Sequence, residues 1–176
     1  RQQHFDRPAL QTTFDEAFDA VLVAAARRDR FDDAIAAMAA DCEFTPVITR
    51  LGCLRGISTL TAFGMATEIG DWHRLTGRSI GNYLGLVPTE YSSGASRSQG
   101  GITRTGNQHV RRLLVESAWH HKPVYRPGST LQQRWKLAPA AVVARADAGN
   151  RRLNRRWQVM TARKKRHTIA TTAIAR

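Results

Sequence analysis

The chain has 176 residues, 42% of them hydrophobic, and a formal net charge of +13 at pH 7. This hydrophobic content is typical of a globular protein and excludes a wholly disordered chain. The charge is uneven, because residues 1–96 hold 9 Lys/Arg and 12 Asp/Glu whereas residues 97–176 hold 18 Lys/Arg and 2 Asp/Glu. A surplus confined to one half favours a surface that binds a polyanion such as nucleic acid, with a solvated basic tail as the alternative.

Cys42 and Cys53 lack the spacing of a zinc site or a disulfide framework, so we expect each to be a small buried apolar residue. No apolar run approaches the roughly 20 residues of a membrane span, and no signal peptide is visible. We therefore expect no membrane contact and a cytoplasmic, nucleoid-associated location. Because the chain begins with Arg1 and not with Met, we also expect it to be a fragment of a longer protein.

We predict a mainly α fold with little sheet, in three parts: a helical arm (1–45), a compact core (46–125) and a basic helical tail (126–176). In the arm, apolar side chains recur three and four residues apart over residues 8–43, which predicts two helices or one long bent helix. The arm is then an antiparallel helical hairpin or a coiled-coil arm, and we expect the protein to form homo-oligomers through residues 8–43.

Two features of the core carry candidate chemistry. The turn Gly56-Ile57-Ser58 lies between predicted helices and resembles a helix-hairpin-helix unit, whose amides would face a phosphate; an ordinary helical corner is the alternative. Residues 88–106 form a predicted glycine-rich loop that holds Ser92 and Ser93. A serine needs a base or nearby positive charge to become a nucleophile. The alternative is a polar surface loop without a catalytic role.

Beyond the loop, Asn107 is predicted to cap a helix that runs to about His121. Arg111 and Arg112 are expected towards its exposed side, where they are candidates for binding nucleic acid. The tail is helical in pattern and strongly basic, and Trp135 and Trp157 are expected to serve in packing. Its basic residues suit the sugar–phosphate backbone of DNA or RNA. The candidates for such contacts in the tail are Arg151, Arg152, Arg155, Arg156, Lys164 and Lys165.

Standard catalytic motifs are absent, including a Walker loop, HExxH and a Rossmann glycine set. Residues 97–176 offer only Glu116 and Asp147 as carboxylates, whereas a two-metal nuclease site needs several. We therefore expect no metal site and no bound cofactor in this chain.

An ordered set of motifs resembles the carboxy-terminal domain of the DEDD-type insertion-sequence transposases (the 110/116/902 type), relatives of the Piv invertase. The resemblance covers residues 46–121 in detail. The motifs that carry it are Leu54-Arg55-Gly56-Ile57-Ser58, Glu68-Ile69-Gly70-Asp71, Tyr83-Leu84-Gly85-Leu86-Val87-Pro88, Ser92-Ser93-Gly94, Gly101-Ile102-Thr103-Arg104-Thr105-Gly106-Asn107 and Val110-Arg111-Arg112-Leu113-Leu114.

The resemblance implies a DNA recombinase guided by a structured RNA, in which a serine attacks DNA and becomes linked to it. That serine is Ser93, or Ser92 if the register is off by one, and Arg97 and Arg104 would offset charge on the phosphate. The family's RuvC-like domain, which would hold Mg²⁺, is missing. The chain alone should therefore bind nucleic acid without recombining it. The alternative is a catalytically inactive, nucleic-acid-binding fragment of a decayed insertion element.

Overall fold

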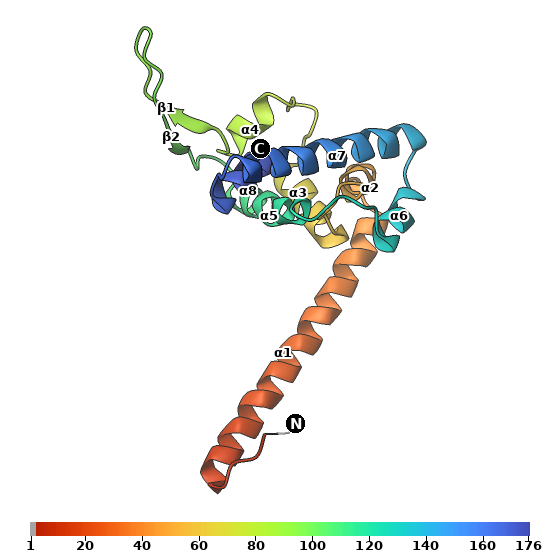
Figure 1. Cartoon of the computed structure of the whole chain (residues 1–176). Coiled ribbons are helices and arrows are strands. Elements are labelled where there is room, and N and C mark those ends of the chain that lie inside the picture. The colour runs from red at the N-terminus through yellow and green to blue at the C-terminus, as the bar shows by residue number, and fades with distance from the viewer. Residues whose placement is uncertain (1–2) are drawn as a thin grey trace. The chain divides into compact units, whose positions relative to one another are not determined.

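A computed structural model describes residues 3–176, and the ribbon in Figure 1 is dominated by helices. The chain divides into two compact units, Arg1–Asp41 and Cys42–Arg176. The only sheet in the described part of the chain has two strands, so the predicted mainly α fold is confirmed. None of the described helices is both long enough and apolar enough to cross a membrane.

The first unit is built around one uninterrupted helix, α1 (Pro8–Ala40), of 33 residues. Pro8 begins this helix, where a missing amide hydrogen costs nothing because first-turn amides have no intrahelical acceptor. The arm is therefore a single helix and not a helical hairpin. Ala39 is the buried residue of α1, and the Phe14 and Phe18 rings stack with centroids 5.9 Å apart.

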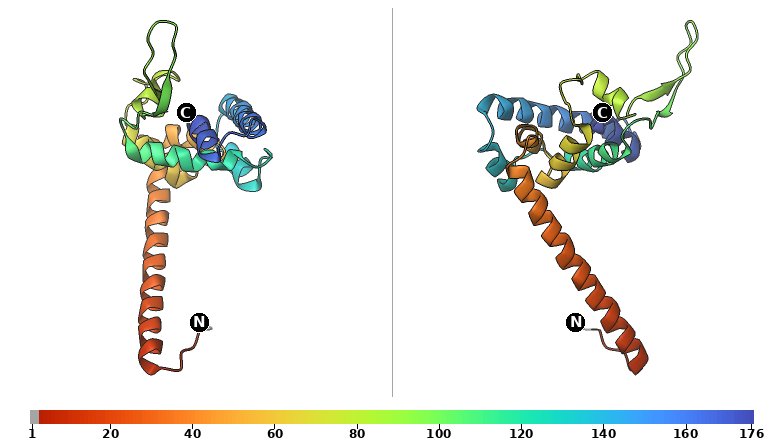
Figure 2. Two further views of the ribbon diagram at one scale, coloured as in Figure 1. Left: turned by 60° about the vertical axis from the view of Figure 1, so that its left-hand side comes forward. Right: turned by 180° about the vertical axis from the view of Figure 1, so that it is seen from behind.

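The second unit is helical apart from one hairpin. Helix α5 packs on α3 and α8, helix α8 packs on α7, and α2 packs on α3 and α6 (Figure 2). Its helices are α2 (Thr45–Gly52), α3 (Thr59–Ile69), α4 (Ser79–Tyr83), α5 (Gln108–Ala118), the 3-10 turn η1 (Trp119–His121), α6 (Ser129–Trp135), α7 (Ala140–Ala162) and α8 (His167–Ala175).

One cluster of core residues in this unit lies where α5, α7 and α8 meet, and α3 buries Ala62, Met65, Ala66 and Ile69 as well. Trp157 is 1% exposed and packs with Ala118, Ala170 and Ile174, which agrees with its predicted role in packing. Trp135 is half-buried, and its Nε1 donates a hydrogen bond to the Cys53 carbonyl oxygen at 3.0 Å. Cys53 is buried as predicted, whereas Cys42 is only half-buried, so the prediction was wrong for Cys42.

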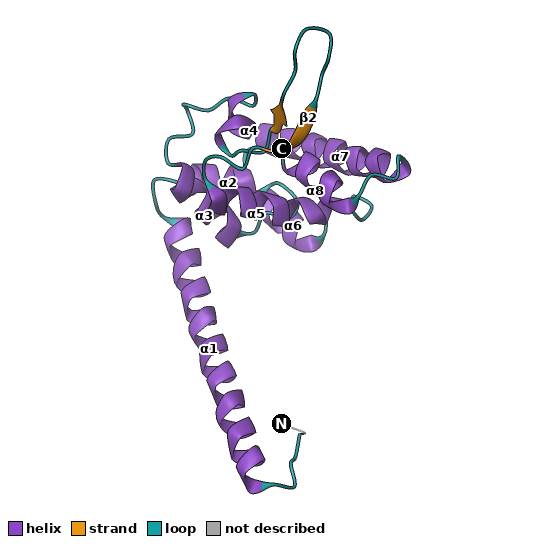
Figure 3. Ribbon diagram, turned by 90° about the vertical axis from the view of Figure 1, so that its left-hand side faces the viewer, coloured by secondary structure: helices purple, strands orange, loops and turns teal. Residues whose placement is uncertain are grey.

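The predicted loop over residues 88–106 contains a β-hairpin, so the prediction was wrong for its two strands. Residues 91–98, which hold both serines, form the connection between them. Strand β1 (Pro88–Glu90) pairs antiparallel with β2 (Gln99–Ile102), and the register shifts between Pro88 and Glu90. Figure 3 shows the two strands and the long connection that projects from the helices. Pro and Gly are depleted in strands, so the local sequence hides a pairing made across the chain.

Candidate nucleic-acid interface

The predicted Gly56-Ile57-Ser58 turn leads into α3. Ser58 is the N-cap of this helix, and its Oγ accepts a hydrogen bond from the Thr61 amide at 3.2 Å. Gly56 has a φ of +86°, and a β-carbon there would lie 2.4 Å from the Ser117 carbonyl oxygen. Both the backbone conformation and the close approach of α5 therefore require glycine.

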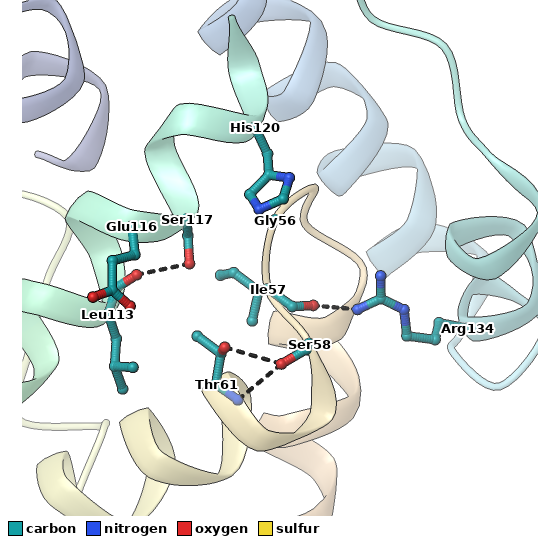
Figure 4. A pocket seen from close by; sticks show the side chains of 9 residues that line it. All are labelled: Gly56, Ile57, Ser58, Thr61, Leu113, Glu116, Ser117, His120 and Arg134. Carbon is teal, nitrogen blue, oxygen red and sulfur yellow. Dashed lines mark hydrogen bonds between the residues drawn. The ribbon is translucent and has the colours of Figure 1, made fainter. Parts of the chain in front are cut away.

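A hollow of about 370 Å³ opens beside this turn (Figure 4). The Arg134 guanidinium reaches in from α6 and donates a hydrogen bond to the Ile57 carbonyl oxygen. Burial lowers the pKa of Arg134, and the nearby Cys53 thiol acts in the opposite direction. His120, the amide end of α3 and the hydroxyls of Ser58 and Thr61 also line the hollow. The one carboxylate in the lining, Glu116, is paired with Arg112. The remaining polar groups could accept an anionic oxygen.

Arg134 and His120 were missed by the sequence analysis. Arg134 lies 77 residues from Ile57, the residue that it contacts. No motif surrounds Arg134, and only the docking of α6 on α2 brings it to the turn. Helical periodicity could assign Arg134 to one face of its helix, but it could not show which segment of the chain packs against that face.

The two candidate serines of the hairpin differ in their hydrogen bonds. The Ser92 Oγ donates a hydrogen bond to Glu90 Oε1 at 2.9 Å, and the same carboxylate oxygen lies 3.6 Å from Arg97 Nε. Ser93 forms two backbone hydrogen bonds with Ser96, at 3.1 and 3.0 Å, across the turn that contains Gly94. Within the described residues the Ser93 Oγ has no hydrogen-bond partner, so its hydroxyl is free to meet a ligand.

The two arginines predicted to flank the phosphate lie at opposite ends of the hairpin. Arg97 is near the tip, on the same side as Ser93 and Ser92. The Arg104 amide donates a hydrogen bond to the Gly85 carbonyl oxygen at 3.1 Å, which places Arg104 at the base. Seven residues, three of them in strand β1, separate Gly85 from Ser93, so the two ends are on the order of 20 Å apart. The structure brings Arg97, and not Arg104, to the serines.

The base of the hairpin is clamped by Arg111, which is half-buried. Its Nη1 donates hydrogen bonds to the carbonyl oxygens of Leu84 and Thr105, both at 2.9 Å. The expectation that Arg111 lies on the exposed side of its helix was therefore wrong, because backbone carbonyls draw the guanidinium inward. Arg112 is exposed as expected, and its Nε lies 3.0 Å from Glu116 Oε1.

The predicted cap of α5 is confirmed. The Asn107 Oδ1 accepts a hydrogen bond from the Val110 amide at 2.9 Å, and the Asn107 Nδ2 donates one to Glu68 Oε2 on α3 at 2.7 Å. The Asn107 side chain thus caps α5 and links the start of this helix to α3 by a hydrogen bond.

The arginines of α7 fall into two groups. Arg151 is engaged: its Nε lies 2.9 Å from Asp147 Oδ2, and its guanidinium lies over the Tyr125 ring. Burial opposes ionisation of Asp147, but hydrogen bonds from Arg151 and Tyr125 outweigh it and lower the pKa of this carboxyl. Within the described part of the chain, Arg152, Arg155 and Arg156 are exposed and have no salt bridge or side-chain hydrogen bond. They are therefore available to a ligand.

Lys164 and Lys165 follow α7 and are exposed as well. Lys164 has a φ of +54°, and the Lys165 amide donates a hydrogen bond to the Met160 carbonyl oxygen at 3.1 Å. The turn thus ends α7 and adds exposed cations beside the C-cap residue of that helix, Arg163.

A sequence profile decides the family. The sequence profile of the IS116/IS110/IS902 transposase family matches residues 49–136, which are half of the chain. The chain belongs to this family. The matched residues of this transposase-family chain include the Gly56 turn, the serine hairpin, Asn107 and Arg111, whereas α7 and α8 lie beyond the profile.

The chain is also similar in sequence to individual transposases from several bacteria. A Sinorhizobium fredii protein that carries the transposase name y4qE is 35% identical over the whole chain, which covers 42% of that protein. The transposase of IS1533 from Leptospira borgpetersenii is 24% identical over 93% of the chain and 48% of its own length. The transposase of IS1328 from Yersinia enterocolitica is 43% identical over 39% of the chain and 21% of its own length. The chain spans less than half of each relative, and no solved structure matches it.

Within residues 3–176, no three His, Cys, Asp or Glu side chains gather in a way that could hold a metal ion. The Mg²⁺ that the resemblance implies would be held by the RuvC-like domain and not by these residues.

Proposed function

We propose that this chain is the carboxy-terminal part of a DNA transposase that binds nucleic acid and supplies Ser93 as the nucleophile for strand exchange. The observation that carries the proposal is the contrast between the two serines. Ser92 Oγ donates a hydrogen bond to Glu90, whereas Ser93 Oγ has no hydrogen-bond partner among the described residues. Ser93 pairs with Ser96 in the connection of the hairpin whose projection Figure 3 shows. Arg97 lies on the same segment, where its Nε is 3.6 Å from Glu90 Oε1, and in the proposal it exchanges this carboxylate for the phosphate.

The proposed step is a transfer of one phosphodiester bond. A bond forms between Ser93 Oγ and the phosphorus, the bond from phosphorus to the leaving strand oxygen breaks, and the serine proton ends on that oxygen. Positive charge near the phosphate stabilises the charge that develops on its other oxygens. We propose that Arg97 acts in this way and that Mg²⁺, where the reaction needs it, is held by acidic residues outside the described chain.

The proposed binding surface combines the free cations of α7 with the Gly56 turn. Arg152, Arg155 and Arg156 would contact phosphates without reading bases, and the α3 N-terminus beside Arg134 would hold a neighbouring phosphate. If six to ten such contacts form, affinity falls by roughly three to five decades between 50 and 200 mM salt. The nucleic acid would be DNA, with a structured guide RNA as a second partner.

The α1 helix supports a proposal of self-association. Val21, Val23 and Phe31 are 62%, 69% and 56% exposed, and apolar side chains on a long helix gain free energy when a second helix covers them. We propose that two copies associate through residues 8–43. Sedimentation of the chain with Phe31→Asp, against exposed Arg30→Asp as control, tests this; equal masses for both variants would contradict it.

The test of the serine joins this chain to the remainder of a family transposase and traps the covalent protein–DNA product on denaturing gels. We expect Ser93→Ala to abolish the adduct and Ser92→Ala to retain it. An adduct that survives Ser93→Ala but not Ser92→Ala moves the role to Ser92. An adduct that survives both removes the serine assignment, and the chain then acts as a nucleic-acid-binding fragment.

A further inference from the structure

Helix α8 has two faces of different character. Ala170, Thr171 and Ile174 are buried, and they face the core shared with α5 and α7. Ile169, on the other face, is 51% exposed although it is a large apolar residue. Ile169, Thr172 and Ala173 line a hollow of about 570 Å³, the volume range of small-ligand pockets.

The opposite wall of this hollow is the base of the serine hairpin. Leu86, Pro88 and Ile102 line it, together with the backbone of Gly100 and Gly101. The hollow is therefore an apolar slot between α8 and the strands that carry the two serines. The clamp made by Arg111 at Leu84 and Thr105 supports this wall from behind.

The rim of the hollow is cationic. Arg156 and Arg176 stand at its edge, and both are exposed without a salt bridge among the described residues. Arg156 also lines a second hollow of about 460 Å³ on α7, with Arg152, Arg155 and Arg163 around Val159 and Met160. Arg156 thus lines both the apolar slot and the hollow among the free arginines of α7.

We propose that this slot receives one unpaired nucleobase of the bound nucleic-acid strand while Arg156 and its neighbours hold the flanking phosphates. The inference rests on the proposed function. A flipped or single-stranded base has two apolar faces that suit Ile102 and Ile169, and its strand carries the negative charge that the rim demands. An apolar protein helix in the slot would make no use of the positive charge of Arg156 and its neighbours.

The test compares two single strands of equal length and charge, oligodeoxythymidine and the same backbone with every base removed, by fluorescence anisotropy with the full chain. We expect the wild type to bind the strand with bases about tenfold more tightly. Ala173→Leu, which fills the slot, and Ile169→Ala, which removes one wall, should each reduce that preference to near unity. Neither removes a charge, so the slope of affinity against salt should not change.

The matched control is Ala141→Leu, the same substitution at an exposed position of α7 outside the slot, which should keep the preference. Ile169 is exposed, so Ile169→Ala keeps the fold if Ala173→Leu does not, and thermal melting of each variant checks this. If both slot variants still prefer the strand with bases, or if the wild type shows no such preference, the proposal that the slot binds a base is overturned, but the proposed function is not. Failure of the wild type to bind either strand overturns the proposed nucleic-acid binding as well.

Discussion

The α-carbon of Gly106 passes so close to Tyr83 that a β-carbon at residue 106 would stand 1.8 Å from the Tyr83 carbonyl oxygen. The neighbouring Gly85 is in the same situation, because its β-carbon would stand 2.3 Å from the Thr105 carbonyl oxygen. Both glycines have positive φ. The two segments that enter and leave the serine hairpin therefore cross with their backbones in contact, which orients the hairpin on the helices.

Gly106→Ala should destabilise the chain by about 3 kcal/mol, because the variant combines left-handed backbone strain with a clash against backbone. Urea unfolding monitored by circular dichroism measures the change. The control is Gly77→Ala, where the added carbon would meet nothing within 4 Å in the described chain and φ is not positive; it should stay within about 0.5 kcal/mol. Equal stability of the two variants would contradict the crossing.

Arg111→Ala should loosen the base of the hairpin, because the Leu84 and Thr105 carbonyls lose their shared donor. Hydrogen exchange should speed up at the amides of Thr103 and Arg104, which bond to Val87 and Gly85, while the Trp157 amide in α7 remains protected.

Arg112→Ala is the matched control for this clamp, since it removes an exposed pair with Glu116 that contributes about 0.5 kcal/mol or less. Unchanged exchange at Thr103 and Arg104 in Arg111→Ala would show that the clamp does not hold the hairpin.

Stability should rise with pH because of His121. Burial, with help from Arg55 and His120, lowers the pKa of His121 from 6.5 to about 4, and its Nδ1 has no hydrogen-bond partner. Between these values the unfolded chain binds the proton and the folded chain does not. The contribution, on the order of 2 kcal/mol, is therefore complete above about pH 6.5 and is lost as the pH falls towards 4.

Urea unfolding at several pH values in this range tests the role of His121. The relevant quantity is the slope of the unfolding free energy against pH, and not the absolute stability of each variant. His121→Gln should flatten the dependence of the unfolding free energy on pH, whereas the exposed His73→Gln should leave it as in the wild type. A slope that does not change in His121→Gln would assign the pH dependence to other groups.

Arg155→Ala should weaken binding to DNA of any sequence and lower the salt slope by about 1, because it removes one free phosphate-binding cation. Arg112→Ala should change the slope less, since Glu116 already offsets that charge. Anisotropy titrations over a series of salt concentrations measure both. If the two variants behave alike, the distinction between paired and free arginines does not govern binding.

Local sequence was sufficient for the parts of this protein that depend on near neighbours. Asn107 bonds to an amide three residues away, and the long α1 arm follows from apolar side chains spaced along one helix. The uneven charge, the glycine turn and the two serines were likewise visible without a fold.

Tertiary structure alone decided which of these groups are free to act. Arg111 and Arg155 look alike in sequence, yet Arg111 reaches the carbonyl of Leu84, 27 residues away, while Arg155 is exposed without a partner among the described residues. The hairpin was hidden for the same reason: strand pairing across Pro88 and two glycines is set by the backbone crossing at Gly85 and Gly106 and not by strand propensity. Side-chain partners and backbone approaches between distant segments are properties of packing, which no local pattern contains.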